Sequence, residues 1–290
     1  MKIAKKIIIG TVQFGNSYGI SNSKGKVKIK EVKNILEFAK QNKIKSFDTA
    51  ISYGDSEKLL GNYKLEDYKV ISKIDKTSLN LISKGYVFNQ IFKILERLKI
   101  NELYGILIHD PNILYSKQGK QLVSYLNECK EYGLVKKVGI SVTNVIDLKN
   151  ILNQFTFDIV QAPFNIFDRR LIQLNLIDYM KKKNIELHVR SIFLQGLLLM
   201  SYDKIPKKFQ KWNKFFKKWE DWVIQNNISK IEACVSFAYL TKDISNILIG
   251  CQSVKELKEI LDVNPEKNFD IPGDLICNDL DLINPTEWLK

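Results

Sequence analysis

The sequence predicts an α/β protein built as one (β/α)8 barrel. Short apolar segments alternate with amphipathic helical segments along the chain, which is the pattern of a parallel sheet. Eight apolar segments can be distinguished, and eight is the number of strands that closes such a barrel. The first of them is not followed by Gly-x-Gly-x-x-Gly, which a doubly wound dinucleotide-binding sheet would carry.

The predicted strands are short and end at glycine, proline or polar residues. The longest interval between neighbours separates the seventh strand from the eighth, so we expect an insertion there. The strands are Ile7–Ile9, Lys45–Asp48, Val70–Lys73, Tyr104–His109, Val138–Val142, Phe157–Ala162, Ile185–Ser191 and Asn246–Gly250.

Helices are predicted where apolar residues recur three or four positions apart between the strands. Gly133 is expected to cap the C-terminus of one helix, and Asn144 and Asp168 are expected to cap the N-termini of two others. The helices are Lys30–Asn42, Ser56–Leu60, Val87–Leu98, Gln121–Tyr132, Asn144–Gln154, Asp168–Lys183 and Ser253–Leu261.

The predicted insertion contains an aromatic and basic segment, Lys207–Trp222. Four large side chains in it follow helical spacing, with lysines between them: Phe209, Trp212, Phe216 and Trp219. We favour a helix that packs on the barrel as its seventh helix, preceded by a loop over the strand ends. A helix lying on a membrane surface would have the same pattern.

Composition favours one domain spanning residues 1–290. A hydrophobic content of 45% suits a full core, and no apolar run approaches the roughly 20 residues of a membrane span. The residues before Gly10 are too few for a signal-peptide core. The 4 cysteines are scattered and there are only 2 histidines, so we expect no metal site and a reducing, cytoplasmic compartment.

The formal net charge of +13 leaves a nucleic-acid or acidic-membrane partner open. Lysines, however, occur in nearly every predicted helix, which is typical of solvated helix faces. We therefore favour a protein with neither a nucleic acid nor a membrane as partner.

Four polar side chains are predicted at the ends of three successive strands. Asp48 ends the second strand and Tyr53 follows it in the loop, while Lys73 and His109 end the next two strands. The carboxyl ends of barrel strands share one face, where active sites of this fold are found. An ammonium lowers the pKa of a nearby phenol, and a carboxylate keeps that ammonium charged, which suits acid–base chemistry. Taken singly, each residue could be structural, and His188 inside the seventh strand is expected to be so.

At these residues the sequence resembles the aldo-keto reductases. The resemblance is carried by Phe47–Ala50, Tyr53-Gly54, Lys73 and Ile108–Asp110, and it continues through Gly133–Ser141, Val160–Asn165, Gln195–Leu198 and Ile249-Gly250. It implies a TIM barrel that reduces a carbonyl compound by hydride transfer from NAD(P)H. Tyr53 would donate the proton, His109 a second hydrogen bond to the same oxygen, and Lys73 and Asp48 would support Tyr53. It also implies that the tail from Pro265 to Lys290 runs back over the barrel.

The resemblance further implies a nicotinamide cofactor site along the strand ends. Ser141 and Gln161 would bind the carboxamide, although Val142 replaces an asparagine of many members. Arg190 takes the place of a stacking aromatic ring, and a guanidinium can also stack; an ion pair with Asp158 or Glu186 is the alternative. The remaining positions are Gly10 and Thr11 after the first strand, Ser191 at the end of the seventh, Leu194, Gln195, Gly196 and Leu197 near the pyrophosphate, and Gly250, Gln252, Ser253, Lys255 and Glu256 at the adenosine end.

The cofactor preference depends on the residues after the eighth strand. Most of the family prefers NADPH and binds its 2′-phosphate there with basic residues. Glu256 falls about where many members have arginine, whereas Lys255, Lys258 and the helix N-terminus would attract phosphate. We expect NADP(H) to be favoured with weak discrimination, and NAD(H) to be possible.

The sequence thus predicts an NAD(P)(H)-dependent oxidoreductase that acts on a small-molecule aldehyde or ketone. Asn16, Tyr18 and Asn165 would line the substrate pocket with hydrogen-bonding groups, which suggests a polyhydroxy compound such as a sugar derivative. Two other classes stay open: a non-catalytic regulatory barrel that binds nicotinamide, and a basic protein that binds nucleic acid or membrane surfaces. The physiological substrate, the reaction direction and the oligomeric state are not predicted.

Overall fold

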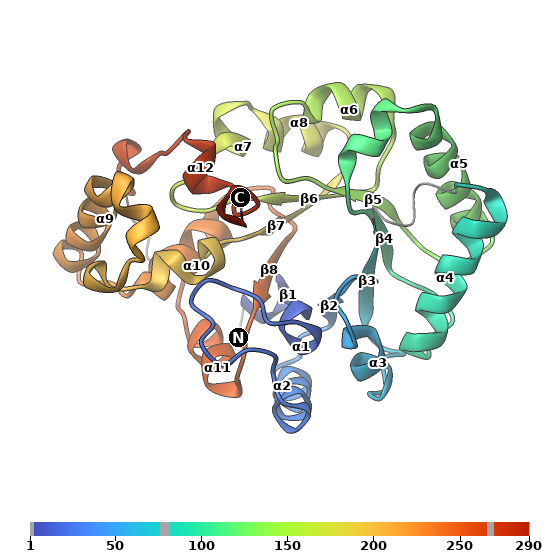
Figure 1. Ribbon diagram of the computed structural model, residues 1–290, viewed down its shortest axis with the longest axis horizontal. Coiled ribbons are helices and arrows are strands. Elements are labelled where there is room, and N and C mark those ends of the chain that lie inside the picture. The colour runs from blue at the N-terminus through green and yellow to red at the C-terminus, as the bar shows by residue number, and fades with distance from the viewer. Residues whose placement is uncertain (1–2, 76–81, 266–269, 290) are drawn as a thin grey trace.

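The computed structural model describes residues 3–75, 82–265 and 270–289, and its strands form a closed parallel barrel (Figure 1). Each strand pairs with the next along the chain, and β8 pairs with β1. All eight predicted strands are confirmed, with ends shifted by at most two residues. They are β1 (Ile7–Gly10), β2 (Ser46–Asp48), β3 (Lys69–Ile74), β4 (Gly105–Ile108), β5 (Val138–Ser141), β6 (Ile159–Pro163), β7 (Glu186–Arg190) and β8 (Asn246–Gly250).

Alternate residues of each strand face the interior of the barrel, because side chains along a strand point to opposite faces. Ile8, Ile71, Leu107 and Ile159 form one buried cluster there. Two positions further along the chain from these four residues lie Gly10, Lys73, His109 and Gln161. The polar side chains therefore form the next layer above the apolar one, at the carboxyl end of the barrel.

Helices surround the strands (Figure 1). The predicted helix Asn144–Gln154 begins only at Leu148, because Asn144 accepts hydrogen bonds from Ile146 N and Arg170 Nη1 instead of capping it. The predicted helix Asp168–Lys183 is interrupted, since Asn175 has a φ of 52°. The helices are α1 (Val12–Gly15), α2 (Ile29–Gln41), α3 (Ser56–Gly61), α4 (Lys84–Leu98), α5 (Lys117–Glu131), α6 (Leu148–Gln154), α7 (Arg170–Gln173), α8 (Leu176–Lys182), α9 (Asn213–Gln225), α10 (Lys230–Leu240), α11 (Val254–Leu261) and α12 (Leu280–Ile283).

The insertion after β7 contains the aromatic segment, and its large side chains are buried. Phe209, Trp212, Phe216 and Trp219 all belong to a second hydrophobic cluster, which includes residues of α10 and of the C-terminal tail. The place of the seventh barrel helix, however, is taken by α10, and α9 lies outside it (Figure 1). The expectation that Lys207–Trp222 would itself be that helix is therefore wrong. The aromatic side chains face protein, not the surface.

The described part of the tail returns to the carboxyl end of the barrel, as predicted (Figure 1). Arg169 donates to the backbone oxygens of Ile271 and Pro272, at 3.2 and 3.0 Å, and Cys277 N donates to Phe167 O. Residues 266–269 and 290 of the predicted tail lie outside the described ranges.

The four cysteines are buried free thiols. Within the described ranges, none of the helices has the length and apolarity to span a bilayer. The same residues contain no cluster of three or more histidine, cysteine or acidic side chains that could hold a metal ion.

We predict that Trp219→Ala will destabilise the protein by about 3–5 kcal/mol, the usual effect of truncating a buried tryptophan. Trp219 is 2% exposed, stacks on Trp222 and donates from Nε1 to Leu198 O. Ile224→Ala on the same helix is the control, because Ile224 is 68% exposed. Urea unfolding measures both variants. Similar midpoints would contradict the packing role of α9.

Candidate functional site

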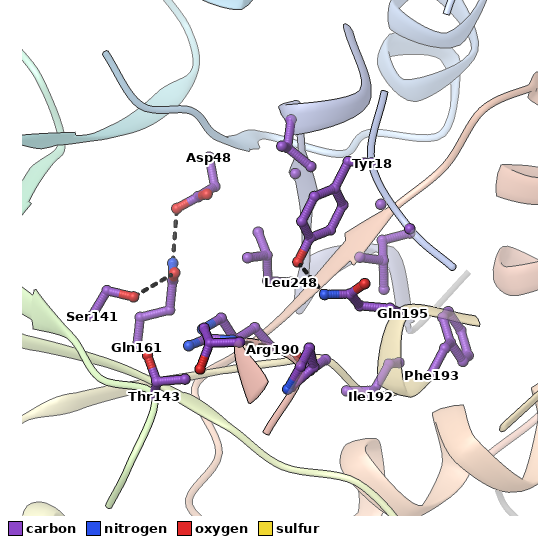
Figure 2. A pocket seen from close by; sticks show the side chains of 18 of the residues that line it. Tyr18, Asp48, Ser141, Thr143, Gln161, Arg190, Ile192, Phe193, Gln195 and Leu248 are labelled. Carbon is purple, nitrogen blue, oxygen red and sulfur yellow. Dashed lines mark hydrogen bonds between the residues drawn. The ribbon is translucent and has the colours of Figure 1, made fainter. Parts of the chain in front are cut away.

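A pocket of about 1430 Å³ opens at the carboxyl end of the barrel (Figure 2). Its walls include the last residue of seven strands or the residue just after it, and from β6 they include Gln161. The volume exceeds the roughly 300–1,000 Å³ of a typical small-molecule site. The pocket therefore has room for two ligands together, or for one long ligand.

A buried ion pair lies at the floor of this pocket. The Lys73 ammonium donates to Asp48 Oδ1 and, at 3.0 Å, to Thr49 O; both charged side chains are 1% exposed. Gln161 Nε2 donates to Asp48 Oδ2 at 2.8 Å, and Ser141 Oγ donates to Gln161 Oε1 at 3.3 Å (Figure 2). The carboxylate therefore has partners on both oxygens, and one chain of hydrogen bonds joins β2, β3, β5 and β6.

Tyr53 and His109 lie next to this pair and line the pocket. The Lys73 Nζ atom is 5.0 Å from the centre of the Tyr53 ring, and the two rings of Tyr53 and His109 meet edge to face at 6.1 Å. The four predicted catalytic residues are thus brought together. Lys73 alone among them does not line the pocket, since it lies behind Asp48 and Tyr53.

The electrostatics of this cluster keep Tyr53 protonated and His109 neutral. Removal from water raises the pKa of the Tyr53 phenol, and the Lys73 charge lowers it only in part. The net shift is opposite to the one expected from the ammonium alone. Burial, reinforced by Lys73, lowers the pKa of His109 to about 4. Burial would also lower the pKa of Lys73, but its interactions with the Asp48 carboxylate and with Tyr53 hold that pKa above its usual value. At neutral pH, both pocket groups can therefore donate hydrogen bonds.

A cluster of hydroxyl groups fixes the loop after β2 that carries Tyr53. The Thr11 hydroxyl donates to Asp48 O at 2.9 Å, and Ser56 Oγ donates to Thr11 O at 3.0 Å. Thr49 Oγ1 donates to Ser56 Oγ at 3.2 Å. Thr11 is therefore a buried link between two loops. The sequence predicted it as a cofactor residue, but it does not line the pocket.

The loop after β1 also clamps the backbone of Tyr53. A Cβ on Gly15 would lie 1.6 Å from Tyr53 O, and one on Gly54 would lie 2.8 Å from Gly15 O. Asn16 Nδ2 donates to Ser52 O at 3.1 Å. Only a glycine at position 15 allows the two backbones to come this close. Sequence analysis missed the role of Gly15, because its contact is with a distant segment.

Most of the predicted cofactor residues line the pocket, but not all of them. Leu194 and Leu197 are fully buried in the second hydrophobic cluster, and Lys255 points to solvent beside Glu259. Ser253 caps α11 by accepting from Glu256 N. Together with Thr11, these four do not line the pocket. The predicted cofactor residues that do are Gly10, Ser141, Gln161, Arg190, Ser191, Gln195, Gly196, Gly250, Gln252 and Glu256.

Arg190 projects into the pocket from the end of β7 (Figure 2). It donates to Val142 O at 2.9 Å and to Ser191 Oγ at 3.2 Å. The alternative ion pairs with Asp158 or Glu186 are not formed, because those carboxylates pair with Lys130 and Lys137. His188 lies inside the barrel and is fully buried, with Nε2 3.3 Å from Glu186, in agreement with a structural role.

The loops after β1 and β7 meet at the edge of the pocket. Gln195 Nε2 donates to the Tyr18 hydroxyl at 3.1 Å (Figure 2), and Ser21 Oγ donates to Gln195 O at 3.4 Å. Asn165, predicted to line the pocket, instead donates to Ser191 O and accepts from the backbone nitrogens that follow it. Its role is to hold the β6 and β7 loops together.

Hydrogen-bond acceptors belong to two residues that line the pocket near α11. Gln13 is 8% exposed, and among the described residues its Oε1 has no hydrogen-bond partner, at a position where a Cβ on Gly250 would lie 2.7 Å away. Glu256 lines the same part of the pocket, and its Oε2 accepts from Gln252 N at 2.8 Å. Sequence analysis missed Gln13, which carries no signal beyond its place in a glycine-containing loop.

Comparison with known proteins identifies the family. The model of the aldo/keto reductase family matches residues 6–271. A search of curated proteins found no match. Among solved structures, the chain resembles an aldo-keto reductase from Bacillus halodurans, AKR11C1, with a TM-score of 0.71, 16% identity, and 90% and 88% of the two chains covered. It also resembles the thermostable aldo-keto reductase Tm1743, with a TM-score of 0.70, 19% identity and 98% and 95% coverage.

A third solved structure, the glycerol dehydrogenase AKR11B4 from Gluconobacter oxydans, has a TM-score of 0.68 and 18% identity, with 93% and 88% of the chains covered. These likenesses agree with the barrel fold. Because the family model covers nearly the whole chain, the protein belongs to the aldo/keto reductase family and is an oxidoreductase by that membership.

We predict that Gly15→Ala will destabilise the protein by about 1–3 kcal/mol, as overpacking does, and will displace Tyr53. Gly85→Ala is the matched control, since a Cβ there meets nothing within 4 Å at the start of α4. It should stabilise by about 0.5–1 kcal/mol, because alanine favours helix. Urea unfolding compares the two variants. Equal midpoints would show that the close contact between Gly15 and the backbone of Tyr53 does not constrain the fold.

Proposed function

We propose that the protein is an NAD(P)(H)-dependent carbonyl reductase in which Tyr53 is the proton donor. The observation that supports this most is the pocket floor, where a protonated phenol and a neutral imidazole lie side by side over a buried ammonium–carboxylate pair. Acid catalysis on a carbonyl needs a proton donor and a second donor for the developing oxyanion.

The residues of the chain divide the work as follows. Tyr53 gives its phenolic proton to the carbonyl oxygen, and a ring N–H of His109 donates a hydrogen bond to that same oxygen. Lys73 stabilises the phenolate that remains, and Asp48 and Gln161 keep the ammonium in place. In the reverse direction, the phenolate accepts the alcohol proton.

A nicotinamide dinucleotide, when bound, supplies the hydride that adds to the carbonyl carbon. The residues fit such a group: Gly10 and Gly250 leave a flat surface between β1 and β8, and Ser141 and Gln161 offer amide-binding atoms. Gln13 Oε1 is an acceptor that has no donor within the described ranges, and the pocket volume suffices for a dinucleotide together with a substrate. Arg190 would contact the nicotinamide end.

For the substrate, we propose a small polyhydroxy carbonyl compound. The pocket rim beyond His109 carries Asn112, Tyr115, Asn144 and Asp147, all able to hydrogen-bond to hydroxyl groups. Initial-rate measurements on aldoses, ketoses and simple aliphatic aldehydes of equal size test this. Faster turnover of the simple aldehydes at equal concentration would contradict it.

We predict that Tyr53→Phe will reduce carbonyl reduction by roughly 10²-fold or more, the scale of general acid catalysis, with the fold intact. Tyr104→Phe is the control, because it also removes a tyrosine hydroxyl, which in the wild type is half-buried and donates to Glu186 at the start of β7. It should keep the parent rate. Steady-state kinetics with one good aldehyde decide the matter, and a parent-like rate for Tyr53→Phe would exclude the assignment.

We predict that Lys73→Met will shift the pH–rate profile of alcohol oxidation to higher pH. Phenolate is the active base in that direction, and the Lys73 charge lowers the pKa of Tyr53, so its loss raises that pKa further. The variant leaves the Asp48 charge buried without its partner, so Asp48→Asn/Lys73→Met serves as a second variant that removes both charges. An unchanged profile in an active Lys73→Met variant would remove Lys73 from the mechanism.

A further inference from the structure

The start of α11 is the part of the pocket where a phosphate would be expected to bind, yet it is already occupied by protein acceptors. The first N–H groups of a helix have no partner within the helix and attract anions. Here Val254 N donates to Glu31 Oε1 at 2.9 Å, and Glu256 N donates to Ser253 Oγ at 3.2 Å. Just before the helix, Gln252 N donates to Glu256 Oε2.

Two carboxylates thus take the place of an external anion. Glu31 comes from α2, and its other oxygen accepts from Asn34. Glu256 belongs to α11 itself and folds back over its first turn, where it lines the pocket together with Glu259. A phosphate group here would compete for the same N–H groups and would also face negative charge.

The lysines of α11 do not reverse this balance. The Lys255 side chain is 86% exposed, and its Nζ lies 3.9 Å from Glu259 Oε1. Lys258 is also exposed, and neither lysine lines the pocket. The neighbouring Gln13 Oε1 adds another acceptor, which is buried and receives no hydrogen bond from the part of the chain that the structure describes. A hydrogen-bond acceptor can bind a ligand hydroxyl, because the hydroxyl donates a hydrogen bond. A fully ionised phosphate can only accept hydrogen bonds and gains nothing from another acceptor.

We infer that this end of the pocket selects NAD(H) over NADP(H), because Glu256 and Glu31 occupy the α11 N-terminus and oppose a 2′-phosphate. The inference rests on the proposed function, since it takes the dinucleotide to extend from Tyr53 to α11. It reverses the sequence-based expectation that NADP(H) is favoured. Lys24, which lines the pocket from the β1–α2 loop, is a basic side chain that would work against this selectivity if it reached the phosphate.

The test is direct binding. Titration of the protein's tryptophan fluorescence with NADH and with NADPH gives two dissociation constants, and ADP-ribose with its 2′-phosphorylated form repeats the comparison without nicotinamide. We expect at least tenfold tighter binding of both ligands that lack the 2′-phosphate, about 1.4 kcal/mol. The ratio should shrink at high ionic strength, because salt screens the repulsion. Equal or tighter binding of NADPH by the parent would overturn the inference. Equal dissociation constants for ADP-ribose and its 2′-phosphorylated form would overturn it as well.

Variants assign the selectivity to residues. Glu256→Gln keeps an acceptor for Gln252 N but removes the charge, and should reduce the ratio several-fold; Glu256→Arg should invert it. Glu232→Gln is the matched control, because Glu232 follows Ser229 in the same capping arrangement on α10 and does not itself line the pocket. Lys24→Met should leave the preference for NADH in place. Thermal unfolding of each variant checks its fold, and a ratio unmoved in both Glu256 variants would contradict the assignment.

The outcome also separates this inference from the proposed function. Tighter binding of NADH with no reduction of any carbonyl compound would refute the reductase proposal and leave the selectivity standing. Reduction with equal use of both cofactors would refute the selectivity alone. Binding of neither dinucleotide would refute both.

Discussion

The ion pair between Lys73 and Asp48 constrains the rest of the site. Each charge is withdrawn from water, which costs several kcal/mol per ion unless attraction and hydrogen bonds offset it. Thr49 O and Gln161 Nε2 complete the pair. Because the amide nitrogen of Gln161 is bound to Asp48, its amide oxygen must face Ser141. The ion pair thus sets the orientation of the pocket wall on β5 and β6 as well as the charge behind Tyr53.

This arrangement depends on the alternation of side chains along the strands. Ile71, Leu107 and Ile159 fill the barrel, and Lys73, His109 and Gln161 lie two residues later on the same face. The apolar layer closes the barrel to water from below, so the polar layer meets solvent only through the pocket. Burial of that kind raises the pKa of Tyr53 and lowers that of His109. The protonation states of Tyr53 and His109 therefore depend on the polar layer and on the apolar layer beneath it, and not on the two residues alone.

The sequence predicted the strand ends and the four clustered polar residues because each follows a short apolar run whose direction is known. It could not predict contacts made by loops. The bond from Gln161 to Asp48 spans 113 positions, and Gly15 meets Tyr53 O through loop conformation alone. Leu194 and Gln195 have φ values of 47° and 54°, so alternation along the chain gives no guide to where their side chains point. Leu194 consequently turns into the core instead of the pocket.

The loop after β1 also joins places that are far apart. Gln13 lies beside Gly250, Gly15 and Asn16 hold the backbone around Tyr53, and Tyr18 meets Gln195. Ordering one stretch of chain therefore orders three parts of the site. A substitution that moves this segment would therefore disturb all three parts of the site at once, because they share one stretch of backbone.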